Sequence, residues 1–185
     1  QQHFWGISVR LLLADEPPPF PRALRIQLAD QRHVVEPADD ARLIALNRVT
    51  GRPVWEVVMP DEAQRYGGTM APLIVKDMVV AGVSGGDWGI RGFLSAYKAA
   101  TGERVWRHWT IPAKGEPGFE TWQGTAVATG GGATWQTGSY DPETDTLYWA
   151  TGNPWPNSDD SERGGDNLFT DCVLALDPAT GKLKW

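Results

Sequence analysis

The sequence has little of several features that define common classes of protein. Its 185 residues include one cysteine, Cys172, so neither an internal disulfide nor a cysteine-based metal site can form within it. No apolar run reaches the roughly 18 residues of a membrane-spanning helix. The net charge is −6 and no basic cluster occurs, which argues against a surface for nucleic acid. No phosphate-binding glycine loop is present, so a nucleotide cofactor is not expected.

One eleven-residue pattern, in contrast, occurs three times. The copies are Ala45 to Trp55 (ALNRVTGRPVW), Ala96 to Trp106 (AYKAATGERVW) and Ala175 to Trp185 (ALDPATGKLKW). Each copy has an alanine, four further residues, Thr-Gly, three residues and a tryptophan. Self-similarity of this length indicates a repeat architecture. We expect the glycine to adopt a positive φ in a turn between two strands, and the indole to bridge adjacent repeats through its N–H group.

The rest of the sequence favours short strands separated by turn residues. Strands are predicted over residues 42–46, 73–75, 78–83, 93–97, 105–111, 146–151 and 172–176. No segment has the pattern of a ten-residue amphipathic helix. Short strands with regular turn signals are typical of an all-β propeller, sandwich or barrel.

The spacing of the repeats predicts where extra residues are inserted. The copies begin at residues 45, 96 and 175, which are 51 and 79 residues apart. A four-stranded blade of a propeller needs roughly 40–50 residues. The second interval therefore contains about one blade and an insertion, which we expect within 112–132. Residues 1–40 are poorly assigned, and 41–185 form the predicted repeat domain.

The T-G-x-x-x-W repeat resembles the tryptophan-docking motif of the quinoprotein alcohol dehydrogenases, which use pyrroloquinoline quinone (PQQ). The segments Ser84–Tyr97, Ile111–Trp122, Gly130–Glu143 and Tyr148–Pro154 resemble that family in order and spacing. The resemblance covers about residues 41–185. It implies an all-β chain that is part of an eight-bladed β-propeller with four-stranded antiparallel blades. About three of those blades would lie in this chain.

Two residues in glycine-rich loops are candidate metal ligands. Asp87 in SGGDWG and Asn153 in TGNP carry hard oxygen donors that suit Ca²⁺. Such residues beside glycine are usually turn residues. The resemblance implies instead that they bind the active-site Ca²⁺ or a lanthanide. The family has glutamate where Asp87 stands, so the ion needs a closer backbone, another position or a bridging water.

Five further residues are candidates for binding PQQ. By resemblance, Trp135 forms one wall against the ring plane, and the three glycines before it suggest backbone that a flat group can approach. A tryptophan in a strand is ordinarily a core residue. Thr69, Ser84, Gly85 and Gly86 would hold carboxylates of PQQ, because a hydroxyl followed by bare amides makes an anion cradle. Thr69 could equally be an ordinary strand residue.

The resemblance implies the oxidation of a primary alcohol, or a related alcohol or sugar, by hydride transfer to metal-bound PQQ. The general base is expected beyond Trp185, so no catalytic residue is assigned and this segment is predicted to be inactive alone. The implied electron acceptor is periplasmic, such as a cytochrome c or a quinone, and the implied location is the periplasm. The alternative is a non-catalytic propeller that serves as a scaffold for protein binding. Exposed apolar patches are expected at both ends of the arc that the three blades would form.

Overall fold

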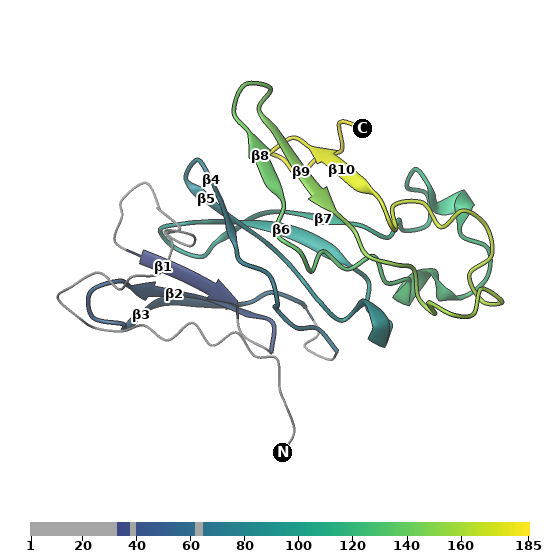
Figure 1. The fold of residues 1–185 in the computed structure, drawn as a ribbon, viewed down its shortest axis with the longest axis horizontal. Coiled ribbons are helices and arrows are strands. Elements are labelled where there is room, and N and C mark those ends of the chain that lie inside the picture. The colour runs from purple at the N-terminus through teal and green to yellow at the C-terminus, as the bar shows by residue number, and fades with distance from the viewer. Residues whose placement is uncertain (1–32, 38–39, 62–64) are drawn as a thin grey trace, which may run out of the picture.

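The computed structural model describes residues 33–37, 40–61 and 65–185 of the chain (Figure 1). Most of the poorly assigned segment 1–40 lies outside the described residues. The described part consists of antiparallel sheets, with short 3₁₀ helices and long connections between them. None of its helices is long and apolar enough to cross a membrane.

Three sheets follow one another along the chain. The first has the order β1 (His33–Pro37), β2 (Arg42–Asn47) and β3 (Pro53–Val58). The second has the order β4 (Leu73–Val75), β5 (Met78–Gly82), β6 (Phe93–Lys98) and β7 (Arg104–Trp109). The third has the order β10 (Val173–Leu176), β9 (Thr146–Ala150) and β8 (Ser139–Asp141). All neighbouring strands are antiparallel, as predicted for blades. Among the described residues the second sheet has the predicted four strands, whereas the first and third have three.

The turn of the eleven-residue pattern has the same conformation in all three copies. Gly51, Gly102 and Gly181 have φ angles of 68°, 75° and 68°, which confirms the predicted positive φ. The amide of Gly51 donates a hydrogen bond of 2.8 Å to the carbonyl of Asn47, and the other two glycines make the equivalent bond. Since an L side chain rarely adopts this φ, the turn requires glycine.

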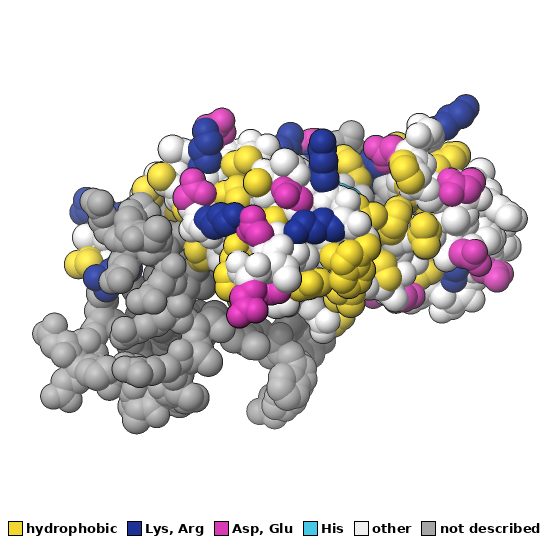
Figure 2. All heavy atoms as spheres, turned by 90° about the horizontal axis from the view of Figure 1, so that it is seen from above, with side chains coloured by type: hydrophobic (Ala, Val, Ile, Leu, Met, Phe, Trp, Pro, Cys, Tyr) yellow, Lys and Arg dark blue, Asp and Glu magenta, His cyan; other side chains and the backbone are white. Residues whose placement is uncertain are grey.

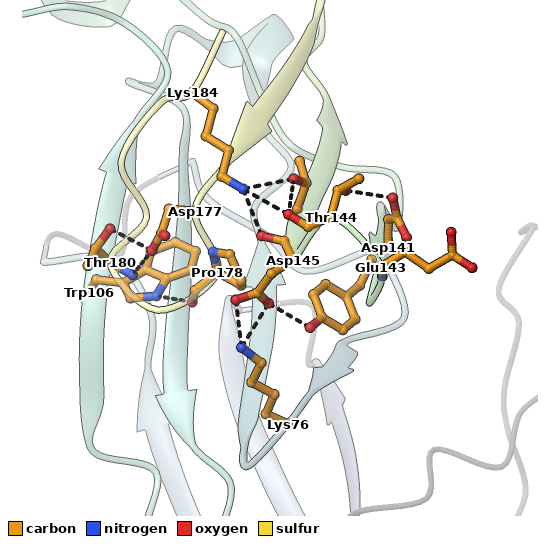
Figure 3. Close-up of polar contacts among 12 residues, drawn as sticks. Lys76, Trp106, Asp141, Glu143, Thr144, Asp145, Asp177, Pro178, Thr180 and Lys184 are labelled. Carbon is orange, nitrogen blue, oxygen red and sulfur yellow. Dashed lines mark hydrogen bonds and ion pairs between the residues drawn. The ribbon is translucent and has the colours of Figure 1, made fainter.

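The tryptophan of one copy contacts the turn of the next. The Trp55 indole donates to the Ala99 carbonyl at 2.9 Å. The Trp106 indole donates to the Pro178 carbonyl at the same distance, 2.9 Å, as Figure 3 shows. Ala99 and Pro178 occupy the same position in successive copies. Each indole therefore ties its own sheet to the next one along the chain.

One hydrophobic core runs through all three sheets. It includes Leu43 of the first sheet, Phe93 of the second and Trp149 of the third, each almost completely buried. The middle sheet lies between the other two (Figure 1), and every residue of β5 is buried. Strands covered on both faces read as continuous apolar runs, and the sequence MVVAG of β5 fits that rule.

The second interval between repeats is long because of two connections rather than one. The predicted insertion at 112–132 lies in the connection from β7 to β8, with the 3₁₀ helices η2 (Phe119–Thr121) and η3 (Ala126–Thr129). A second connection, residues 151–172, was not predicted. The two pack together through backbone hydrogen bonds, of which that from Gln123 to Gly164 measures 2.7 Å. They form the loop-rich region beside the third sheet in Figure 1.

Charged side chains are interleaved on the surface. On the face in Figure 2, Lys and Arg alternate with Asp and Glu among apolar side chains. Several large apolar side chains are exposed on the first and third sheets, including Val54, Val58, Val173 and Trp185. Trp185, the tryptophan of the third copy, is 68% exposed, whereas Trp106 is 8% exposed beneath the next turn.

Candidate functional site

Four chain segments meet at one end of the middle and third sheets. Gly67 and Ser84 form a bridge with two backbone hydrogen bonds, of 2.9 and 3.2 Å. The amide of Thr134 donates to Val83 at 3.0 Å, and the next segment joins in the same way through Gly152 and Ala133. The backbone therefore places segments from residues 67, 84, 134 and 152 side by side.

A cavity of about 670 Å³ opens where these segments meet. Twelve residues of the described part of the chain line it. They include all seven residues that the sequence predicted for PQQ and metal, namely Thr69, Ser84, Gly85, Gly86, Asp87, Trp135 and Asn153. Residues up to 84 positions apart in the chain thus share one hollow. The 3₁₀ helix η1 (Gly86–Trp88) forms part of its wall.

The two candidate metal ligands face each other. The side-chain amide nitrogen of Asn153 donates a hydrogen bond of 3.1 Å to the Asp87 carboxylate and a second of 3.0 Å to the Pro154 carbonyl. Asp87 is exposed on the cavity side of η1. In the part of the chain that the structure describes, no group of three or more His, Cys, Asp or Glu residues could hold a metal ion. A cation between Asp87 and Asn153 would therefore need further ligands.

Trp135 is a cavity residue rather than a core residue. Its side chain is 48% exposed, while nearby Trp149 is 1% exposed. The Trp135 carbonyl accepts a hydrogen bond of 3.4 Å from the Thr69 hydroxyl. The indole therefore offers open ring surface beside a hydroxyl that the sequence had assigned to the same ligand.

The three glycines before Trp135 have a different role from the predicted one. A Cβ at Gly131 would lie 2.6 Å from the Asn153 carbonyl oxygen, and one at Gly130 would lie 2.7 Å from the Trp122 ring. A Cβ at Gly132 would lie 2.7 Å from the Ile111 side chain. Protein atoms thus occupy the space beside each glycine. These glycines allow three chain segments to cross closely, and the approach of a flat ligand does not explain them.

Five lining residues were not predicted from the sequence, and three of them, Arg65, Tyr66 and Trp88, have large side chains. Trp88 is 69% exposed, and its carbonyl accepts a hydrogen bond of 3.1 Å from the Arg65 guanidinium. Burial raises the pKa of the Tyr66 phenol, which donates to the Arg91 carbonyl at 2.9 Å. Arg65 and Tyr66 also line a second hollow of about 360 Å³. Trp88 lies within the predicted motif SGGDWG, and Arg65 and Tyr66 lie within four residues of Thr69. This proximity in the sequence was the available signal.

Successive antiparallel sheets that are tied by tryptophans and share a cavity at their strand ends define a β-propeller type of repeat protein. Residues 29–185 match the family described as PQQ glucose/ethanol/alcohol dehydrogenase, β-propeller domain. The chain belongs to this family.

Individual relatives agree with that assignment. Quinohemoprotein alcohol dehydrogenase ADH IIB of Pseudomonas putida is 44% identical over 161 residues, in an alignment that covers 79% of this chain and 23% of the relative. Lanthanide-dependent methanol dehydrogenase of Methylacidiphilum fumariolicum is 38% identical, over 79% of this chain and 27% of the relative. The structure of quinohemoprotein alcohol dehydrogenase ADHIIG from Pseudomonas putida HK5 superposes with a TM-score of 0.79 at 34% identity, covering 84% of this chain and 25% of that one. The chain spans about a quarter of the length of these relatives.

Proposed function

We propose that this chain supplies about three blades of an eight-bladed, PQQ-dependent dehydrogenase that oxidises a primary alcohol or a related alcohol or sugar. The observation that carries the proposal is the convergence of seven residues, chosen from the sequence alone, on one cavity of about 670 Å³. The contacts of Trp55 and Trp106 with the next turns support the role of tryptophan-docking motifs.

The residues present fit a bound hard cation. Asp87 supplies a carboxylate, and Asn153 supplies an amide oxygen once the side-chain amide turns over. Oxygen donors of this kind suit Ca²⁺ or a lanthanide, which require six or more ligands. Because two side chains cannot complete that shell, the cation would need further oxygen ligands besides Asp87 and Asn153. The shorter side chain of Asp87 fits this role because its loop already brings the carboxylate to Asn153.

The residues also fit a flat, acidic cofactor. Trp135 offers the exposed ring face for stacking, and Thr69 and Ser84 offer hydroxyl donors at the same wall. The N–H groups of Gly85 and Gly86 precede or begin the 3₁₀ turn, where backbone donors lack intrahelical partners. When bound, PQQ supplies the quinone that accepts hydride from the alcohol. The role of these residues is to bind and orient it.

The remaining parts of the reaction are assigned outside this chain. Asp87 is the one carboxylate among the lining residues, and its role here is that of a metal ligand. We therefore propose that the general base lies beyond Trp185 and that residues 1–185 alone have no dehydrogenase turnover. The proposed electron acceptor is a cytochrome c or a quinone, and the proposed location is the periplasm.

A binding titration tests the proposal on the complete protein that carries these residues. PQQ is added in the presence of Ca²⁺ or La³⁺, and the dissociation constant is obtained from quenching of tryptophan fluorescence. We expect Trp135→Ala to weaken PQQ binding by about tenfold or more, since it removes the stacking wall. Trp185→Phe is the control, because Trp185 does not line the cavity. A protein-binding scaffold would show no quenching with any variant, and that result would exclude the dehydrogenase.

A further inference from the structure

Arg65 brings a positive charge to the cavity. Of the twelve described residues that line the cavity, Arg65 is the only basic one and Asp87 the only acidic one. The Arg65 guanidinium donates a hydrogen bond to the carbonyl of Trp88, which is the residue after Asp87. Arginine has five N–H donors in a planar fork, so this bond leaves donors for a ligand. The Arg65 guanidinium therefore contacts η1, the 3₁₀ turn that contains the proposed metal ligand Asp87.

The backbone of Arg65 is fixed against the predicted anion cradle. A Cβ at Gly85 would lie 2.1 Å from the Arg65 carbonyl oxygen, so the two chain segments touch directly. Two residues further on, Gly67 pairs with Ser84 through backbone hydrogen bonds in both directions. The position of Arg65 relative to Ser84 and Gly85 is therefore set by main-chain contacts.

Arg65 also adopts an uncommon backbone conformation. Its φ is 70°, which is a left-handed conformation that non-glycine residues rarely adopt. Residues in such conformations concentrate at ligand sites, where the surrounding contacts hold them in place. Here the contact with Gly85 and the pairing of Gly67 with Ser84 hold the Arg65 backbone in place. The Arg65 side chain is exposed and lines both this cavity and the adjoining hollow of about 360 Å³.

We propose that Arg65 is a further cofactor-binding residue, which binds one carboxylate of PQQ through its guanidinium. The inference rests on the proposed function. PQQ carries three carboxylates, and a cation at Asp87 leaves negative charge elsewhere on the ligand. Arginine is suited to this role because its planar fork matches a carboxylate with two parallel hydrogen bonds. The adjacent hydroxyl of Ser84 and amide of Gly85 complete a mixed anion site.

The test compares three variants of the complete protein by the same fluorescence titration. Arg65→Asn removes the charge while keeping a residue that tolerates a left-handed backbone. We expect it to weaken PQQ binding by about 10- to 100-fold, the usual effect of losing a hydrogen bond to a charged group. Arg65→Lys should recover part of the loss. Arg52→Asn, at an exposed position in the first turn, should leave binding unchanged.

A second ligand separates a carboxylate contact from a loss of folding. The trimethyl ester of PQQ has no carboxylate, so Arg65→Asn should bind it as well as the wild-type protein does. Equal weakening for PQQ and its ester would overturn the inference, because the guanidinium would then act on the fold. Unchanged PQQ binding in Arg65→Asn would also overturn it, while leaving the proposed function intact. Failure of the wild-type protein to bind PQQ would overturn both.

Discussion

The Asn153 side-chain amide lies 3.1 Å from the Asp87 carboxylate, although 66 residues separate them in the chain. This pair predicts a cation site in which Asp87 contributes the charge. We expect Asp87→Asn to weaken lanthanide binding by about tenfold or more, because affinity follows the charge of the ligands. Tb³⁺ luminescence, excited through the indoles of Trp88 and Trp135, reports the dissociation constant.

The matched control for this substitution is Asp77→Asn. Asp77 is an exposed aspartate in the turn between β4 and β5, so its loss changes the net charge equally. Equal weakening by the two variants would mean that Tb³⁺ responds to overall charge alone, and the proposed site would be wrong.

The contact of each indole with the next turn predicts how glycine substitutions act on stability. A Cβ at Gly181 would lie 2.5 Å from the Trp106 ring, and one at Gly102 would lie 2.7 Å from the Trp55 ring. Gly51 has the same left-handed φ, but no atom of the other described residues would lie within 4 Å of a Cβ there. Gly51→Ala should therefore cost only the backbone strain, about 1–2 kcal/mol. Gly102→Ala and Gly181→Ala should cost about 1–3 kcal/mol more, because they overpack the interface.

Urea unfolding followed by circular dichroism measures these differences in the free energy of unfolding. Equal losses of unfolding free energy in the three variants would show that the indoles do not pack tightly against the turns.

The repeated parts of the fold could be predicted because their conformation depends on residues that are neighbours in the sequence. The Thr-Gly turn needs a left-handed residue, and β5 needs apolar residues on both faces, so each is visible locally. The predicted strand 105–111 is too long, since Thr110 leaves the sheet, where its hydroxyl donates to the Gly132 carbonyl at 2.7 Å. β8 was missed because its sequence SYD has neither length nor alternation. β8 is a strand because it pairs with β9, and its own three residues do not show that pairing.

The site was predictable to a similar extent and for a similar reason. Asp87, Trp135 and Asn153 stand in motifs, so their types and order were visible before the fold was known. Arg65 was not found because its importance comes from the pairing of its segment with Ser84, which no spacing reveals. The glycines at 130–132 were recognised, but the sequence does not show which atoms occupy the space beside them.

Burial of His108 predicts a pH dependence of stability. Burial lowers the pKa of its imidazole below the ordinary value, so the folded protein holds the ring neutral. The unfolded chain binds a proton as the pH falls below about 6.5, and stability is lost as the pH falls further through the folded pKa. We expect His108→Gln to flatten this part of the stability profile.

Urea unfolding at pH 7.5 and pH 5.5 checks that expectation. The wild-type protein should lose more stability between these pH values than the variant does. An identical loss in both would mean that His108 is protonated freely in the fold.

The crossing at Gly131 predicts a link between stability and the cation site. Its carbonyl accepts the amide of Gly92 at 2.8 Å, and its Cα packs on the Asn153 carbonyl, so it joins the segments of both metal-ligand candidates. An alanine here would place Cβ 2.6 Å from that oxygen and push Asn153 away from Asp87. We therefore expect Gly131→Ala to lower Tb³⁺ affinity and to destabilise the fold. Gly115→Ala is the control, since the φ of Gly115 is 91° and, in the part of the structure that is described, no atom would lie within 4 Å of the new Cβ. It should cost stability through backbone strain and leave Tb³⁺ affinity unchanged, whereas equal Tb³⁺ affinity in the two variants would show that the crossing does not position Asn153.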